Sequence, residues 1–176
     1  MTLTERLPLP SKLGLLAALG SGALLGGAYY FQYVVGLSPC EMCYWQRWPH
    51  MVAIAVGLLA LASFAWPRLA LVFMLTAITA LIITAGIGVF HVGVEYHWWA
   101  GPQACTGNVP RGLSPEQLKK YLFGAKMVRC DETAWAMWGI SMAGWNAIAS
   151  GFLALASLVS SMRRKTNKDW HENVLR

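Results

Sequence analysis

The sequence predicts an all-α fold: an integral membrane four-helix bundle with two loops on one side and a short interfacial helix. Two observations support this prediction. Of the 176 residues, 56% are hydrophobic and 12% are charged, which is too apolar for a soluble domain of this size. The chain also contains four uncharged runs, and a helix of about twenty residues crosses a hydrocarbon core of roughly 30 Å. These runs are Leu13–Cys40, Trp48–Pro67, Leu69–Val94 and Thr133–Met162.

The whole chain, 1–176, is predicted to form one membrane domain. The first apolar run is longer than the core of a signal peptide, which argues against a secretory leader. This run contains Gly22 and Gly26, a spacing that lets a neighbouring helix approach closely. The predicted helices occupy about 13–37, 49–66, 69–94 and 139–162, and the predicted loops about 38–48 and 95–138.

The second predicted helix is the shortest span. Trp48, Pro49 and His50 are assigned to the membrane interface, so the span runs from there to about Trp66. The turn Trp66-Pro67-Arg68 is very short. The second and third helices should therefore form an antiparallel hairpin.

An even number of crossings places both termini on one side of the membrane and both cysteine-bearing loops on the other. Eight of the 14 Lys and Arg residues lie on the terminal side, and the cluster 163–165 directly follows the last run. The positive-inside rule then predicts cytoplasmic termini and loops in a compartment that permits disulfides. The basic tail fits a stop-transfer cluster beside anionic membrane lipid better than a nucleic-acid site, so no nucleic-acid partner is expected.

A Cys-x-x-Cys pair, Cys40 and Cys43, lies between the first two helices. This spacing suits a redox dithiol, half of a zinc site or a haem attachment site. Tyr44 stands where haem attachment requires His. Cys105 and Cys130 are unlike the tight second pair of a zinc ribbon, so no metal is predicted. A structural disulfide suits these two cysteines, but a bridge between Cys40 and Cys43 would close too small a loop to stabilise much.

Cys43 is the better candidate for a reactive thiolate. The second helix should begin near it, and the amides at a helix N-terminus provide positive potential. Arg47 follows one turn later and adds a permanent positive charge on the same face. Arg47 could instead act only as an interfacial anchor that extends toward lipid head groups.

The pattern Pro-Cys-x-x-Cys-x-x-x-Arg after a first helix, with two further cysteines in the second outer loop, resembles the DsbB family of disulfide-forming quinone reductases. The resemblance covers essentially the whole chain and implies a protein of the bacterial inner membrane with periplasmic cysteine loops. It also implies a soluble periplasmic thiol oxidant similar to DsbA as partner. The implied cofactor is a membrane quinone, ubiquinone or menaquinone, which links the protein to the respiratory chain through the quinone pool.

The same resemblance implies a role for each cysteine. Cys105 would exchange with the dithiol of the soluble partner, and Cys130 would exchange with Cys40. Cys43 would then remain as a thiolate against the quinone ring, where Arg47 would polarise a quinone carbonyl. The pair Glu41-Met42 departs from the apolar residues found between these cysteines in the best-studied member, and an acid there should raise the pKa of a thiolate.

Other residues are weaker candidates. His91 lies at the outer end of the third helix and is a candidate for the quinone pocket, as the resemblance also suggests. Ser114 to Gln117 form a capping-box pattern with Pro115 at the first helical position, which predicts a short interfacial helix. Six tryptophans are expected to form an interfacial aromatic belt: Trp48, Trp98, Trp99, Trp135, Trp138 and Trp145.

Other functions remain open at this point. Vitamin K epoxide reductase follows a related logic, but its Cys-x-x-Cys lies late in the bundle. A membrane adaptor with structural disulfides or a zinc site would need no reactive Cys43 and no functional Arg47. A transporter is disfavoured, since no acidic residue lies inside the four runs.

Overall fold

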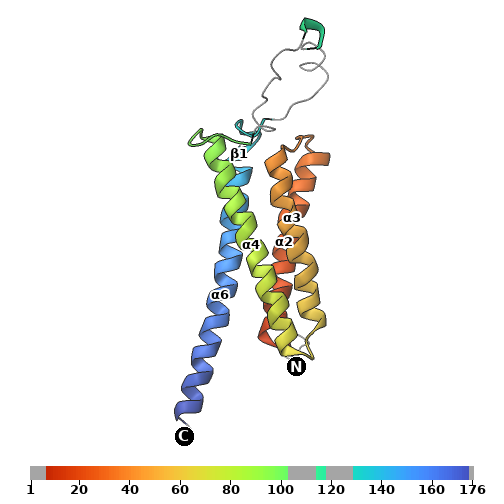
Figure 1. Ribbon diagram of the computed structural model, residues 1–176. Helices are drawn as coiled ribbons and strands as arrows, with labels where there is room; N and C mark the ends of the chain where they lie inside the picture. The colour runs from red at the N-terminus through yellow and green to blue at the C-terminus, as the bar shows by residue number, and fades with distance from the viewer. Residues whose placement is uncertain (1–6, 103–113, 118–128, 175–176) are drawn as a thin grey trace.

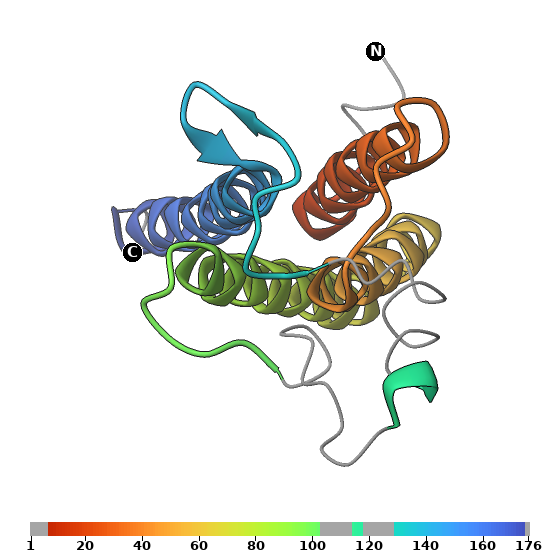
Figure 2. The same ribbon diagram turned by 90° about the horizontal axis from the view of Figure 1, so that it is seen from above.

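The computed structural model describes residues 7–102, 114–117 and 129–174. Its long helices run side by side (Figure 1), and from above they follow the order α2, α3, α4, α6 around the bundle (Figure 2). α2 begins and α6 ends at one end, here called the inner end; the opposite end is the outer end. The prediction of a mainly helical membrane protein is confirmed. The helices are α2 (Leu9–Tyr33), α3 (Glu41–Ala62), α4 (Pro67–Glu95) and α6 (Met142–Val174).

Three helices of the described chain are long and apolar enough to cross a membrane: α2, α4 and the part of α6 from Met142 to Arg163. α3 has 22 residues but is not among them. Its first half carries Gln46, Arg47 and His50, and these polar side chains lower its mean hydropathy. α3 nevertheless packs against both α2 and α4 within the bundle.

The helix boundaries follow local chemistry. α2 begins after Pro8 and has a second proline in its first turn, where a missing N–H costs nothing. It ends at Tyr33, ahead of Gly36, whose φ of 82° reverses the chain. α3 begins at Glu41, inside the segment predicted as a loop at 38–48, because the Cys40 side chain caps it. Pro49 is accommodated inside this helix.

A small hairpin precedes α6. β1 (Ala136–Met137) pairs antiparallel with β2 (Ile140–Ser141). The turn residues Trp138 and Gly139 both have positive φ, of 54° and 78°, as a two-residue type I′ turn requires. The hairpin occupies the start of the helix predicted at 139–162, so α6 begins at Met142. This short sheet is the one departure from an all-α fold among the described residues.

The predicted capping box is present. The Ser114 backbone N–H donates to the Gln117 side-chain oxygen, and the Gln117 N–H donates to the Ser114 hydroxyl, at 3.1 and 3.3 Å. Residues 115–117 form a helical turn. The rest of the predicted interfacial helix lies outside the described residues.

Close helix packing occurs at glycines other than those expected. A Cβ added to Gly57 on α3 would collide with the Gly14 carbonyl oxygen of α2, so these backbones touch. A Cβ at Gly22 or Gly26 would meet no described atom within 4 Å, and the close approach predicted there is wrong for the described chain. The apolar core of the inner half consists of Leu13, Ala17, Met74, Ala77, Ile78, Leu81 and Ala154.

Candidate active site

Cys40 and Cys43 form one local unit at the outer end of α3. Cys40 is extended, with φ −79° and ψ 172°, and its Sγ accepts a hydrogen bond from the Cys43 backbone N–H at 3.2 Å. The two sulfurs lie 2.7 Å apart, and both thiols are free. The spacing of three residues thus serves both the helix cap and the contact between the two sulfurs.

The two sulfurs differ in acidity, and both precede the apolar part of α3. The hydrogen bond to Cys43 and then burial raise the pKa of Cys40. The hydrogen bond from Cys40 is the largest cause that lowers the pKa of Cys43, and the Arg47 charge contributes a smaller part. Burial and the Glu95 carboxylate oppose this lowering. Cys43 is therefore the more acidic thiol, mainly because of its partner cysteine.

The acid that acts on Cys43 comes from another helix. Glu95 ends α4, whereas Glu41, the acid expected from the sequence to raise the Cys43 pKa, is exposed. Folding therefore brings a distant carboxylate toward the thiol and leaves the adjacent one in solvent.

Arg47 faces the interior of the bundle. Only 7% of the residue is exposed, and its guanidinium donates to the Gln32 side-chain oxygen of α2. The guanidinium carbon also lies 5.0 Å from the ring centroids of Tyr29 and Tyr44. An anchor that extends to lipid head groups would be exposed, so this geometry favours a role inside the bundle.

His91 joins the cysteine pair from α4. Its Nε2 lies 3.6 Å from Cys40 Sγ, and its Nδ1 lies 2.8 Å from the Gln46 side-chain nitrogen. Only 3% of His91 is exposed. The backbone of Cys130 also forms a hydrogen bond with this ring. His91 therefore links α3, α4 and the segment that follows the second outer loop.

Cys130 completes the cluster. It is fully buried, forms a disulfide, and packs with Cys40, Met42 and Val94. The ligand atoms of Cys40, His91 and Cys130 all lie within 4.8 Å of one another. Cys130 Sγ thus lies within this distance of Cys40 Sγ, close enough for a small rearrangement to allow exchange. Cys105 lies outside the described residues.

The three atoms of this cluster could also form part of a metal site, but a metal ligand must be a thiolate. The disulfide at Cys130 removes one of them in the state described. A zinc site would first require reduction of that disulfide.

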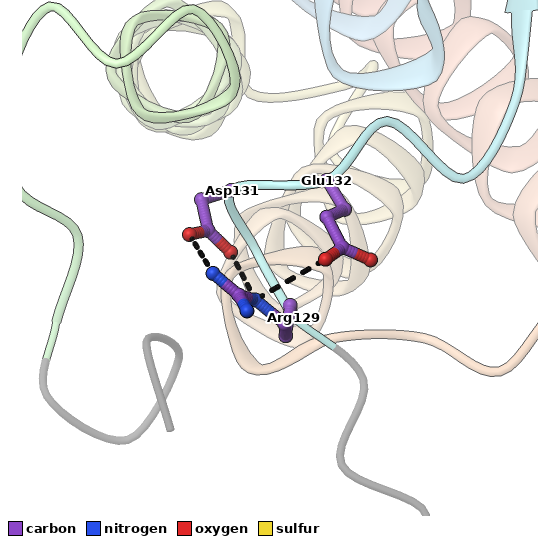
Figure 3. A network of polar contacts seen from close by, with 3 residues as sticks. All are labelled: Arg129, Asp131 and Glu132. Atoms are coloured by element: carbon purple, nitrogen blue, oxygen red, sulfur yellow. Dashed lines mark hydrogen bonds and ion pairs between the residues drawn. The ribbon is translucent and has the colours of Figure 1, made fainter. Parts of the chain in front are cut away.

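The chain on either side of Cys130 is fixed by ion pairs, as Figure 3 shows. The Arg129 guanidinium donates two hydrogen bonds to the Asp131 carboxylate, at 2.6 and 2.9 Å. A weaker contact of 3.4 Å reaches Glu132. This geometry holds the residues that flank Cys130 in a defined turn.

A cavity of about 330 Å³ opens beside these groups. Its apolar wall is formed mainly by α2, and its polar wall carries Cys43, Arg47 and His91. Apolar walls with a few polar groups are typical of sites for small organic ligands. Trp135 and Trp145, expected to belong to an interfacial belt, line this cavity instead. The other four tryptophans of the expected belt are exposed.

Sequence reasoning missed a group of polar residues at the cavity, of which Gln46, His50 and Asn146 line it. Gln46, His50, Thr84 and Asn146 form a buried hydrogen-bonded chain across three helices. Thr84 and Asn146 each interrupt an apolar run. Polar residues inside predicted spans are a signal for a functional site, and they could have been selected on that ground.

Comparison with known proteins shows the family of this chain. The model of the family described as Disulfide bond formation protein DsbB matches residues 10–160. The Disulfide bond formation protein B of Marinobacter nauticus is 32% identical over 155 residues, which cover 84% of this chain and 89% of that protein. The protein of the same name from Polaromonas naphthalenivorans is 31% identical, covering 85% and 89%. No solved structure matches the chain. The family match covers most of the described helices and includes Cys40, Cys43 and Cys130. The chain therefore belongs to the DsbB family of disulfide bond formation proteins.

Proposed function

We propose that this protein reoxidises a soluble periplasmic dithiol protein similar to DsbA and passes the electrons to a membrane quinone. The observation that carries this proposal is the proximity of a disulfide-bonded Cys130, a free Cys40 thiol and a more acidic Cys43 thiol beside an apolar cavity. Membership of the family supports disulfide formation in general. The proposal is that the soluble partner is a DsbA-like dithiol protein and that the electron acceptor is a membrane quinone.

The exchange steps balance in thiols and disulfides. The partner dithiol reduces a disulfide between Cys105 and Cys130, so the partner becomes oxidised and two thiols appear in the outer loop. Cys130 then attacks Cys40 in a Cys40–Cys43 disulfide, and Cys43 leaves as a thiolate. Cys105 then attacks Cys130 in the Cys130–Cys40 disulfide, and Cys40 leaves as a thiolate. The loop disulfide re-forms, and the Cys40–Cys43 pair holds both electrons.

The residues around the cavity fit a quinone, either ubiquinone or menaquinone. A bound quinone supplies an acceptor for two electrons and two protons. Arg47 is buried with its charge beside the cavity, where it would hold a ligand carbonyl and stabilise developing negative charge. The apolar α2 wall would exclude water from Cys43. Loss of both electrons returns Cys40 and Cys43 to a disulfide.

The test is quinone reduction by purified protein in mild detergent, driven by a reduced DsbA-like partner and followed by quinone absorbance. Wild type should reduce the quinone continuously, whereas Cys43→Ser and Cys105→Ser should show no turnover. Cys43→Ser should still form a mixed disulfide with the partner, because Cys105 is intact, whereas Cys105→Ser should not. Absence of turnover with both quinones, together with inert thiols or bound zinc, would replace this proposal with a structural role.

The topology belongs to the same proposal. We place four crossings in the bacterial inner membrane, with cytoplasmic termini next to anionic lipid and both cysteine loops in the periplasm. The packing of α3 between α2 and α4 supports a crossing by α3 despite its polar first half.

Labelling of intact cells with a membrane-impermeant thiol reagent tests this crossing. Ser38→Cys and Arg68→Cys flank α3, and both native side chains are exposed. In a background where the four native cysteines are replaced by Ser, only Ser38→Cys should react. Equal labelling of the two variants would mean that α3 does not cross.

A further inference from the structure

Four side chains that can bind a metal meet at the outer end of the bundle. Cys40 caps α3, Cys43 lies in its first turn, and His91 lies near the end of α4. Cys130 comes from the segment before the hairpin. The ligand atoms of Cys40, His91 and Cys130 lie within 4.8 Å of one another, and Cys43 Sγ lies 2.7 Å from Cys40 Sγ. The disulfide at Cys130 keeps this set incomplete in the state described.

The distances suit a tetrahedral zinc site. Zinc binds thiolate sulfur at about 2.3 Å and imidazole nitrogen at about 2.0–2.1 Å. In a tetrahedron these bonds place two sulfurs about 3.8 Å apart, and a sulfur and a nitrogen about 3.6 Å apart. Cys40 Sγ and His91 Nε2 already lie 3.6 Å apart. Cys130 Sγ needs only a small shift, and Cys43 Sγ must move about 1 Å away from Cys40 Sγ.

Cys130 is held in the cluster by contacts other than its disulfide. Its side chain is fully buried and packs with Met42. Its backbone forms a hydrogen bond with the His91 ring. The hydrogen bonds from Arg129 to Asp131 fix the chain on either side of it. Reduction of the disulfide therefore frees the sulfur without removing the residue from the cluster.

The surroundings of the four side chains also suit a metal site. The Cys43 backbone N–H donates to Cys40 Sγ at 3.2 Å, a bond that stabilises a thiolate there. Zinc on one His91 nitrogen leaves the ring proton on the other, and the Cys130 backbone and the Gln46 side chain offer acceptors for it. Cys40, His91 and Cys130 are 5%, 3% and 0% exposed. The site is closed to water, as structural zinc sites are.

The nearby positive charge fits the same ion. Three thiolates and Zn²⁺ together carry one negative charge, whereas a monovalent ion with the same ligands would leave two. Arg47 is 7% exposed and lines the same cavity as Cys40 and Cys43. Its guanidinium places a positive charge beside the site, which reduces the cost of burying the complex.

We propose that the fully reduced protein binds one zinc ion, and that the complex is a reversible inactive state. The ligands are Cys40, Cys43, Cys130 and His91. Zinc replaces the thiol protons of the three cysteines, and neither the ion nor any sulfur changes its oxidation state. While zinc is bound, Cys40 and Cys43 cannot form a disulfide, and Cys130 cannot exchange with Cys40.

The inference rests on the proposed function only for the origin of the reduced state. Each partner dithiol delivers two electrons and two protons. When this supply exceeds removal by the acceptor, both disulfides are reduced and all four cysteines become thiols. Zinc then withdraws the protein from exchange until the ion is removed.

The first test is a cobalt titration of the purified protein in detergent, without oxygen. The protein is reduced with a phosphine, which is then removed. Co²⁺ replaces zinc in tetrahedral sites and absorbs visible light there, and its thiolate charge-transfer band grows with each sulfur ligand. The reduced protein should bind one Co²⁺ per chain with the bands of a three-thiolate site, and Zn²⁺ should displace it. Absence of these bands, or equal bands in the oxidised protein, would overturn the inference.

The second test identifies the ligands by alkylation and peptide mass. One equivalent of Zn²⁺ should slow the modification of Cys40, Cys43 and Cys130 by at least about tenfold, because a bound thiolate is a poorer nucleophile than a free one. Cys105 is not in the ligand set and should react at the same rate with and without zinc. A chelator should restore the three rates. An unchanged rate at Cys130 would contradict the proposed ligand set.

Cys130→Ser and Cys105→Ser form a matched pair of variants. Under the proposed pairing, each leaves the loop without its disulfide, but only Cys130→Ser removes a ligand. Its zinc affinity, measured by competition with a coloured chelator, should fall by more than about a hundredfold, the upper range for loss of a group that only supports a ligand. Cys105→Ser should match the reduced wild type. Equal affinities for the two variants would refute a site that includes Cys130.

These three measurements use neither quinone nor partner, so their outcome is separate from that of the turnover assay. In that assay, zinc added to the reduced protein should stop quinone reduction, and a chelator should restore it. Continued turnover with zinc bound would disprove the inactive state. Zinc in the oxidised protein as isolated would be a structural ion and would also overturn the inference.

Discussion

The inner and outer halves of the bundle are held together by different means. In the inner half, α2 and α3 touch backbone to backbone at Gly14 and Gly57, and small and aliphatic residues form the core. In the outer half, Gln46, Thr84 and Asn146 join three helices by hydrogen bonds between uncharged groups. The cavity and the cysteine cluster occur only in the outer half of the described chain.

The difference shows how a small membrane bundle can keep space for a ligand. Tight packing of small residues leaves no room, but directed hydrogen bonds can hold helices at a separation that packing alone would close. Uncharged amides and hydroxyls do this without placing a net charge in the apolar interior. Changes in side-chain volume should therefore affect mainly the inner half, and changes in hydrogen bonding or charge should affect mainly the outer half.

The largest effect is expected for Arg47→Ala, in the outer half. Removal of a buried charge beside the cavity should lower kcat/KM for quinone by about a hundredfold, as for loss of one stabilising donor. Arg47→Lys should recover only part, since an ammonium group cannot replace the planar contacts with Tyr29 and Tyr44. Steady-state quinone reduction measures both variants.

Arg68→Ala is the control for this change, because Arg68 is an exposed arginine at the inner end. Its kcat/KM should match wild type. If Arg47→Ala is as active as wild type while helical content is unchanged, Arg47 has only a packing role.

The next largest effect is expected for Gly57→Leu, in the inner half. The added side chain would collide with the Gly14 carbonyl, and backbone cannot move aside as a side chain can. Overpacking of this kind costs roughly 1–3 kcal/mol, and sometimes more, in the free energy of unfolding. Denaturant unfolding in detergent micelles, followed by circular dichroism, measures the loss.

Gly26→Leu provides the contrast, because an added Cβ there meets no described atom within 4 Å. It should change the unfolding free energy little. Equal losses for the two variants would mean that glycine flexibility, rather than helix contact, is responsible.

Much of the candidate site was predictable from the sequence because its reactive groups lie in one short motif. Cys40, Cys43 and Arg47 fall within a single helix start, so spacing alone predicts their proximity. His91 could be proposed from its place at a helix end. The buried hydrogen-bonded chain could not, because it depends on the rotation of α4 and α6 about their axes, which the uniformly apolar runs do not fix.

The fold, like the site, has features that the sequence predicts and features that it does not. Apolar runs indicate how many long helices to expect, but they do not fix where a helix begins when the capping group is unusual. The expectation that the second helix begins near Cys43 is confirmed, but the predicted range 49–66 starts it too late. Cysteine is not a recognised N-cap residue, although Cys40 caps here. The contact at Gly14 and Gly57 was missed because spacing within one helix cannot identify a glycine pair shared by two.

A smaller effect is expected for Thr84→Val, which keeps the shape of a fully buried side chain but removes its hydroxyl. The Asn146 amide then loses an acceptor, and the Gln46 carbonyl loses a donor. The expected cost is about 1–2 kcal/mol in the free energy of unfolding.

Thr76→Val on the same helix is the control. The Thr76 hydroxyl is exposed and bonds only its own helix, at the Val72 carbonyl, so its loss should be close to neutral. Both variants are measured by denaturant unfolding. Equal costs would mean that the interhelical bonds of Thr84 add nothing beyond a bond within one helix.

The smallest effect is expected at the rim of the outer half, where the pair Arg129 and Asp131 is charged and partly exposed. The Arg129 guanidinium lowers the pKa of Asp131. This pair therefore stabilises the fold at pH values above the usual pKa of an Asp carboxyl group. The contribution is lost as pH falls through the lowered pKa, and salt should weaken it. The thermal midpoint of Asp131→Asn should therefore lie slightly below wild type at neutral pH and converge with it in acid, whereas Glu132→Gln should change less. A difference that grows on acidification would mean that Asp131 acts through something other than its charge, and the contrast between this charged pair and the uncharged hydrogen bonds of Gln46, Thr84 and Asn146 would fail at this point.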